Sequence, residues 1–370
     1  MKKCAFPIIL FVVWLLSACN DEMMPSSPDV DTNDLTGIAY DPQPFDLDIP
    51  SNFPQMVIPQ DNPLTVDGVD LGRRLFYDPI LSIDSTKSCS SCHLPSGNFT
   101  DNTALSTGVS GNMTRRSSMT LLNIGFVNEG LFWDGREDLL EHQALLPIED
   151  PVELENDWEN VESKLRLHGS YPGFFRKAFG IESKSEINRD LATKAIAQFE
   201  RTLVSSGNSK YDRVIRGEAI FTDQELTGHD IFFDINEDIS RHAECGHCHN
   251  APLFTTNEFF NNGVQAQIGE DIFPDNGLGE VTGNRFDNGM FRTPTLRNIF
   301  SSAPYMHDGR FETLDDVIDH YITGGHPARN LDAVLRPLNM SDEDRAALIA
   351  FIRTLEDPDF INNPSFQNPF

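Results

Sequence analysis

The chain contains two short stretches of the same pattern, Cys89-Ser90-Ser91-Cys92-His93 and Cys245-Gly246-His247-Cys248-His249. In a Cys-x-x-Cys-His motif, two thiols can add across the vinyl groups of one haem while the adjacent imidazole binds its iron. A redox Cys-x-x-Cys pair, or a four-thiolate zinc site shared by both pairs, would leave the histidine after each pair unexplained. The repeat therefore predicts two covalently attached haems c, one held by Cys89, Cys92 and His93 and the other by Cys245, Cys248 and His249.

Length and patterning indicate the fold class. At 370 residues with 39% apolar content, the chain is long enough for two modest domains, with one haem motif in each. Apolar residues recur at helical spacing, for example Leu191, Ala195, Phe199 and Leu203, whereas strand signals are scarce. No repeat is visible beyond the two motifs. We expect a mainly α fold of two c-type cytochrome domains, each wrapped around one covalently attached haem.

Several helix boundaries are marked by capping residues. Thr313 with Asp316, and Ser341 with Asp344, form capping-box patterns that predict helix starts. Gly324-Gly325 predicts the end of the first of these helices. Apolar periodicity predicts further helices near 136–146, 157–167, 188–204 and 222–234.

The N-terminus carries export signals. Met1-Lys2-Lys3 is followed by an apolar run over residues 4–16, which is typical of a signal peptide and too short to span a bilayer permanently. Leu16-Ser17-Ala18-Cys19 resembles the lipobox of bacterial lipoproteins, in which the cysteine is acylated and becomes the mature N-terminus. The alternative is an ordinary cleaved signal followed by a chance cysteine. We expect a periplasmic protein that is anchored to the membrane through lipid on Cys19.

Composition sets the expected domain boundaries. Residues 1–18 are the expected lipoprotein signal peptide. Residues 19–45 are the expected disordered tether, because positions 20–45 hold six acidic residues, four prolines and no basic residue. The N-terminal haem domain is then expected over 46–207. A C-terminal electron-transfer haem domain follows over 208–357, and a tail over 358–370.

The charge balance bears on the choice of partner. The 28 Lys and Arg residues against 57 Asp and Glu residues give a net charge of −29. Such a surface argues against binding to nucleic acid or to anionic lipid headgroups. It favours a basic partner such as a small cationic electron-transfer protein, and solubility in a salty habitat explains it equally well.

The chain resembles the bacterial di-haem cytochrome c peroxidases and their relative MauG, the methylamine-utilisation enzyme, over roughly residues 63–355. Besides the two haem motifs, the resemblance is carried by Phe132-Trp133-Asp134-Gly135-Arg136, Pro151-Val152-Glu153, Phe291-Arg292-Thr293-Pro294-Thr295-Leu296-Arg297-Asn298 and Pro304-Tyr305-Met306-His307-Asp308-Gly309. It implies that hydrogen peroxide is reduced at the first haem with electrons relayed from the second. The donor would be a small cytochrome, a cupredoxin or, as for MauG, a partner protein. A di-haem electron-transfer protein without peroxidase activity is the alternative.

The resemblance also implies roles for three side chains. Glu153 matches the family's catalytic glutamate, Gln143 its distal glutamine, and Trp133 the tryptophan that relays electrons between the haems. A carboxylate suits O–O bond cleavage because the reaction needs a group that takes a proton from one oxygen and returns it to the other. A lone tryptophan, without this match, is more often a core residue.

The chain departs from the family at one position. Many family peroxidases have a histidine some sixteen residues after the proximal one, which blocks the first iron until the second haem is reduced. Here that position is near Val109, and no histidine occurs between His93 and His142. We therefore expect the first haem to be open without reductive activation, as in MauG.

The second haem, with His249, requires a sixth ligand. In ordinary family peroxidases this is a methionine fourteen residues after the histidine of His-Asp-Gly. Counting from His307 reaches Tyr321, and MauG uses tyrosine at that place. Tyr321 is therefore the expected ligand, although apolar neighbours on its helix face also suit a core residue. Met306 is the rival ligand.

The family also holds a calcium ion between the haems through backbone carbonyl groups. The matching residues here are Ser302 and Pro304. The usual asparagine partner is replaced by Ser117, whose hydroxyl is a poorer oxygen donor. One calcium ion is therefore expected in addition to the two haems.

Overall fold

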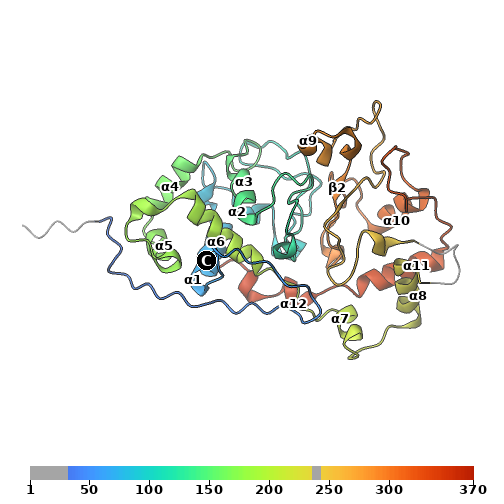
Figure 1. Ribbon diagram of the computed structural model, residues 1–370, viewed down its shortest axis with the longest axis horizontal. Helices are drawn as coiled ribbons and strands as arrows, with labels where there is room; N and C mark the ends of the chain where they lie inside the picture. Colours follow the sequence, from blue (N-terminus) through green and yellow to red (C-terminus); the bar gives the residue numbers. More distant parts are fainter. Residues whose placement is uncertain (1–31, 236–242) are drawn as a thin grey trace, which may run out of the picture.

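The computed structural model describes residues 32–235 and 243–370, and they form a mainly helical molecule, as predicted. The helices of the N-terminal half are α1 (Val66–Tyr77), α2 (Leu140–Gln143), α3 (Leu146–Glu149), α4 (Trp158–Leu167), α5 (Tyr171–Phe179) and α6 (Arg189–Arg201). The C-terminal half contains α7 (Lys210–Ile215), α8 (Asp223–Phe233), α9 (Leu278–Thr282), α10 (Leu314–Thr323) and α11 (Asp342–Arg353), followed by α12 (Pro358–Ile361). The strands β1 (Phe259–Phe260) and β2 (Phe291–Arg292) pair antiparallel. The two halves lie side by side along the long axis of the molecule (Figure 1).

Each half is built on two long helices that approach each other closely at a glycine. α1 packs against α6, and a Cβ added at Gly72 would lie 1.8 Å from the carbonyl oxygen of Ala195. α8 packs against α11, where a Cβ at Gly228 would lie 1.9 Å from the carbonyl oxygen of Ala347. Each glycine stands 17 residues before the first cysteine of a haem motif (89 − 72 and 245 − 228). The two halves therefore repeat one structural unit, a similarity that the sequence alone did not reveal.

Both ends of the described chain lie against the N-terminal half. Leu35 is buried in its apolar core, so residues 32–45, part of the segment expected to be a tether, run along the globule. At the other end, the Tyr77 hydroxyl of α1 donates a hydrogen bond to the carbonyl oxygen of Phe366, and the C-terminus lies beside α1 (Figure 1). The expected signal peptide and Cys19 lie outside the described residues. Within the described ranges, no helix is both long and apolar enough to cross a membrane.

A buried ionic cluster joins the two halves. The Arg116 guanidinium pairs with Asp134 in the N-terminal half and with Asp275 in the C-terminal half, where its Nε lies 2.8 Å from Asp275 Oδ2. All three side chains are about 90% buried, so solvent and salt screen these pairs only weakly. The cluster holds the loop that carries Trp133 against the C-terminal half.

Candidate active site

The first haem motif forms a short turn after α1. Residues Cys89–Ser91 make one turn of 3₁₀ helix, closed by a hydrogen bond from the Ser88 N–H to the Ser91 hydroxyl oxygen. The His93 Nδ1 atom lies 2.9 Å from the carbonyl oxygen of Phe99, so Nδ1 carries the proton and Nε2 keeps its free lone pair. Burial lowers the pKa of His93, which favours the neutral imidazole that binds a metal.

A cavity adjoins this motif and collects the predicted catalytic residues. It contains about 700 Å³ of space, open solvent at its mouth included, and is lined by Cys89, Cys92, His93, Gln143 and Glu153. We call it the first cavity. Gln143 is the last residue of α2, and Glu153 follows α3 in a turn. The structure therefore brings together residues that are 60 positions apart in the chain (153 − 93).

Glu153 has the properties of a proton carrier. Burial raises the pKa of its carboxyl group to about 7; the Asp150 carboxylate raises it further and Arg136 opposes the shift. At neutral pH both the acid and the carboxylate are therefore populated. The backbone around it is fixed, since the carbonyl oxygen of Glu153 accepts a hydrogen bond from the N–H of Val109, 2.9 Å away.

Val109 is near the position at which many family peroxidases have the histidine that blocks the first iron, and its bond to Glu153 places it beside the catalytic turn. The neighbouring Gly108 packs so tightly on this turn that a Cβ there would lie 2.0 Å from the carbonyl oxygen of Val152. Among the described residues that line the first cavity, His93 is the only histidine, and none is a methionine.

Glu200 is a first-cavity residue that the sequence analysis did not identify. It lies on α6 and is 5% exposed, and its Oε2 atom has no hydrogen-bond partner among the described residues. Burial raises the pKa of this carboxyl group to about 8. The sequence did not indicate that Glu200 is buried, because a single glutamate on a helix usually faces solvent.

The second haem motif repeats the arrangement of the first. Residues Cys245–His247 make one 3₁₀ turn, and the His249 Nδ1 atom lies 3.1 Å from the carbonyl oxygen of Pro294. Burial lowers the pKa of His249 to about 4, so this imidazole is also neutral with Nε2 free. The four cysteines of the two motifs are free thiols in this structure.

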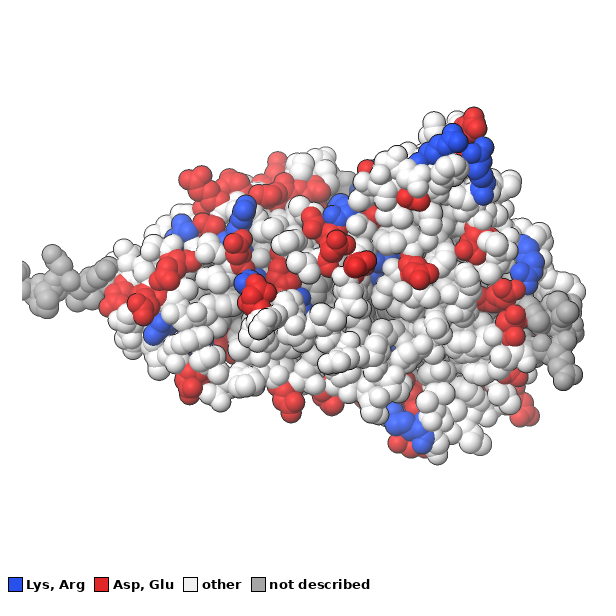
Figure 2. All heavy atoms as spheres, viewed as in Figure 1, with Lys and Arg blue, Asp and Glu red and all other residues white. Residues whose placement is uncertain are grey.

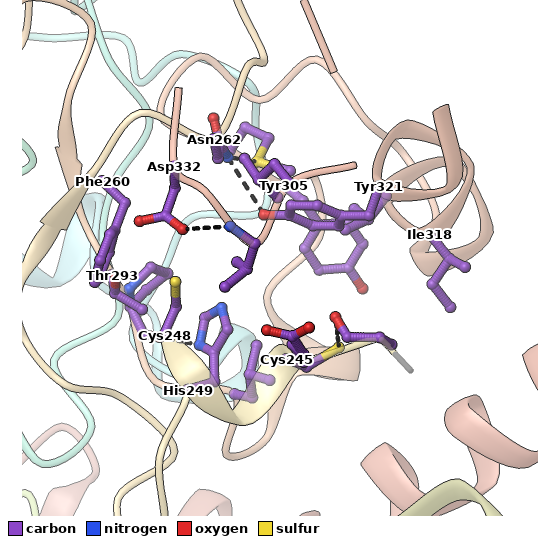
Figure 3. Close-up of a pocket in the computed structure, with 18 of the residues that line it drawn as sticks. Cys245, Cys248, His249, Phe260, Asn262, Thr293, Tyr305, Ile318, Tyr321 and Asp332 are labelled. Carbon is purple, nitrogen blue, oxygen red and sulfur yellow. Dashed lines mark hydrogen bonds between the residues drawn. The ribbon is translucent and has the colours of Figure 1, made fainter. Parts of the chain in front are cut away.

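A larger cavity, the second cavity, opens in front of this motif. It contains about 1480 Å³ of space, open solvent at its mouth included, and its wall is mainly apolar. His249 lies on one side, and Tyr321 from α10 points into the cavity from another (Figure 3). Met306 lines the same cavity, so both expected sixth ligands are present in it.

Tyr321 and Met306 share one neighbour, which the sequence analysis did not identify. The Asn262 Nδ2 atom lies 3.3 Å from Tyr321 Oη and 3.4 Å from Met306 Sδ. Burial raises the pKa of Tyr321 to about 12, and the hydrogen bond from Asn262 opposes this shift.

Trp133 lies on the wall of the second cavity and is absent from the lining of the first. Its indole N–H donates to the carbonyl oxygen of Ser117 at 2.9 Å. Its own carbonyl oxygen accepts from the Arg292 N–H of β2, also at 2.9 Å. His307 stands beside it with ring centroids 6.5 Å apart, and stacks on Phe291 at 3.8 Å. The tryptophan thus belongs to the N-terminal half but contacts the C-terminal one.

Arg292 is a buried cation on the wall of the second cavity. Its guanidinium donates to the Phe132 carbonyl oxygen and the Asn257 side-chain oxygen, and contacts the Met119 sulfur. It is 5% exposed, and no carboxylate of the described residues pairs with it. Burial lowers the pKa of Arg292 to about 10. A buried cation without a carboxylate partner is costly, and the anionic propionates of a haem would supply the missing charge. The thiols, neutral histidines, apolar walls and Arg292 together fit haem.

The hydroxyl groups of two residues near the expected calcium site have protein partners in this structure. The Ser302 hydroxyl accepts from the Asn98 amide at 3.1 Å, and the Ser117 hydroxyl donates to the Met306 carbonyl oxygen at 2.9 Å. No group of three or more His, Cys, Asp or Glu suited to a metal ion occurs among the described residues. Calcium at Ser302 and Pro304 stays a prediction.

Comparisons with known proteins show which family the chain resembles. A family profile described as di-haem cytochrome c peroxidase matches residues 66–220. The methylamine utilization protein MauG of Methylorubrum extorquens is 36% identical over 305 residues, which cover 80% of each chain. Cytochrome-c peroxidase IdrP1 of a Pseudomonas species is 33% identical, over 82% of this chain and 84% of that one.

The fold is also similar to the folds of proteins with solved structures. The crystal structure of a MauG-like protein associated with microbial copper homeostasis superposes with a TM-score of 0.80 at 34% identity, over 88% of this chain and 99% of that one. The diheme peroxidase BthA from Burkholderia thailandensis has a TM-score of 0.67 over 82% of this chain and 90% of that one. At 23% identity, this match shows a likeness of fold alone.

Proposed function

Because this chain belongs to the di-haem cytochrome c peroxidase family, which includes MauG, and is a peroxidase-type oxidoreductase, we propose that it reduces hydrogen peroxide in the first cavity. The second haem takes electrons from an external donor and passes them on. The observation that carries the proposal is the shared cavity of His93, Gln143 and Glu153. It combines a neutral imidazole with a carboxyl group whose pKa, raised to about 7 by burial, is suited to acid–base work at neutral pH.

The two cofactors would be held by residues of both motifs. Cys89 and Cys92 form the thioether bonds of the first haem and His93 binds its iron; Cys245, Cys248 and His249 do the same for the second. When bound, the haems supply the iron at which the O–O bond is broken and the path by which two electrons arrive. In balance, one peroxide, two electrons and two protons give two waters.

The protein's part in this reaction is mainly the handling of protons. The Glu153 carboxylate accepts the proton of one peroxide oxygen and returns it to the other, which leaves as water. The Gln143 amide donates a hydrogen bond that orients the peroxide. The two protons that the overall reaction consumes enter from solvent at the mouth of the cavity. Burial raises the pKa of Glu153 to about 7, which suits a group that must both accept and return a proton near neutral pH.

Electron entry is assigned to the C-terminal half. Tyr321 is the proposed sixth ligand of the second haem, with Met306 as the rival, and Trp133 is the proposed relay to the first haem, supported by its place on the wall of the second cavity. The proposed donor is a small basic cytochrome or a cupredoxin. Asp and Glu side chains are spread over the face in Figure 2, and that charge favours a basic donor. In the MauG-like variant, side chains of a partner protein give the electrons.

Export and attachment complete the proposal. The lipobox at Cys19 would place the protein in the periplasm with a lipid on its N-terminus, and residues 46–207 and 208–357 would be its two haem domains. Calcium bound through Ser302 and Pro304 belongs to the same proposal.

The test is a steady-state assay in which reduced cytochrome c is oxidised by the purified holoprotein with and without hydrogen peroxide. We expect oxidation to need peroxide and to consume two cytochromes per peroxide. Oxidation that is independent of peroxide would support the alternative, a di-haem electron-transfer protein without peroxidase activity.

A further inference from the structure

The side-chain amide of Asn262 faces both candidate ligands of the second haem. Asn262 lies in the loop after β1, and its Nδ2 atom is 3.3 Å from Tyr321 Oη and 3.4 Å from Met306 Sδ. The bond to Tyr321 is visible in Figure 3, where both residues point into the second cavity. Tyr321 and Met306 come from different segments, α10 and the loop before it, and Asn262 is the point at which they meet.

The direction of the amide is determined by its other contacts. The Val264 N–H donates to the Asn262 Oδ1 atom at 3.2 Å, so the oxygen of the amide is used and its NH₂ group faces the two ligands. The Asn262 carbonyl oxygen lies 2.9 Å from His320 Nε2, and His320 precedes Tyr321 on α10. The next carbonyl oxygen, that of Gly263, accepts from the His326 N–H at 2.7 Å. The loop is therefore fixed to the helix that carries the tyrosine.

We infer that Asn262 is a positioning residue that favours Tyr321 over Met306 as the sixth ligand of the second haem. This rests on the proposed function, in which one of the two binds that iron. A hydrogen bond to an anionic tyrosine oxygen is strong, whereas thioether sulfur is a weak acceptor. The same amide therefore stabilises the tyrosine-bound state and holds the sulfur of Met306 aside. Loss of a hydrogen bond to a charged acceptor should lower the ratio of the tyrosine-bound to the methionine-bound state roughly ten- to a hundredfold.

A simpler role for Asn262 is to close its own turn through Oδ1 and the Val264 N–H. The two roles use opposite ends of the amide, so one substitution separates them. Asn262→Asp keeps an oxygen for Val264 but replaces the NH₂ donor by a second oxygen, which repels an anionic tyrosine. Asn262→Ala removes both ends.

The experiment compares ferric holoproteins of equal haem content. Asn262→Asp, Asn262→Ala, Tyr321→Phe and Met306→Leu are examined for the near-infrared charge-transfer band of thioether–iron ligation, for the EPR signal of the second haem, and for its midpoint potential. We expect the band to appear in Asn262→Asp, with a higher potential because methionine ligation raises it. The band should vanish when Met306→Leu is added.

Two outcomes would overturn the inference, and they are distinguishable. If Tyr321→Phe changes the spectrum but Asn262→Asp resembles the unsubstituted protein, Asn262 only closes its turn and the proposed ligand stands. If Tyr321→Phe changes nothing, or the unsubstituted protein already shows the thioether band, the ligand assignment fails and the inference fails with it.

Discussion

Replacing Glu153 by glutamine should make the protein less active and, at neutral and alkaline pH, more stable. Burial raises the pKa of the Glu153 carboxyl group from 4.5 to about 7. Each pKa unit corresponds to about 1.36 kcal/mol, so ionising this group inside the fold costs roughly 3 kcal/mol more than in the unfolded chain. Glutamine has nearly the same shape and cannot ionise.

The sign of the pH dependence follows from linkage. Below pH 4.5 the carboxyl group is protonated in both the folded and unfolded chain, and the substitution has little effect. As the pH rises from 4.5 through about 7, the unfolded chain loses this proton before the folded one, and stability falls. Above pH 7, Glu153→Gln should therefore have a free energy of unfolding up to roughly 3 kcal/mol greater than that of the unsubstituted protein.

The activity should change in the opposite direction. Without a group that accepts and returns a proton, the turnover of peroxide should fall by roughly 10²–10⁴-fold. The assays are denaturant unfolding of the holoprotein at pH 4.5 and pH 8, and peroxide-dependent oxidation of reduced cytochrome c. The control is Glu149→Gln, which alters an exposed glutamate at the end of α3 and should change neither quantity. Turnover within about twofold of normal, or a loss of stability at pH 8, would refute the role given to Glu153.

Three further substitutions test other parts of the account. Tyr321→Phe should change the low-spin EPR signal of the second haem. An unchanged signal would mean that Tyr321 is a core residue and does not bind the iron. Arg292→Gln removes a buried cation from the second cavity, so it should lower the midpoint potential of that haem in a redox titration; Arg285→Gln, at an exposed arginine, should leave the potential unchanged. Cys19→Ala should release the protein from membranes in cell fractionation, and continued membrane association would contradict the lipobox.

Local signals in the sequence predicted much of the helical structure. The capping boxes predicted at Thr313 and Ser341 are present, and each begins a helix. The helix expected over 188–204 is α6, which runs from Arg189 to Arg201. These signals succeed because capping and apolar periodicity depend on residues a few positions apart.

The sequence did not predict one helix, and it predicted two short helices as one. α5 (Tyr171–Phe179) was not expected, because Pro172 and the aromatic residues around it resemble a loop until they are buried. The helix expected over 136–146 is instead two short helices, α2 and α3, and Pro147 stands in the first turn of the second.

Long-range relationships could not be predicted from spacing. The close approaches at Gly72 and Gly228 depend on helices more than 100 residues away. The importance of Glu200, Arg292 and Asn262 likewise comes from burial and from what they face. By contrast, Gln143 and Glu153 were identified from motifs, and the structure places both beside the first haem motif.

The first haem is expected to be open to peroxide without prior reduction. Low-temperature EPR of the ferric protein as isolated, before and after one equivalent of peroxide and with no reductant added, tests this expectation. Because His93 is the only histidine among the described residues lining the first cavity, we predict a high-spin signal that disappears when peroxide is added. Two low-spin signals that peroxide does not change would contradict the account.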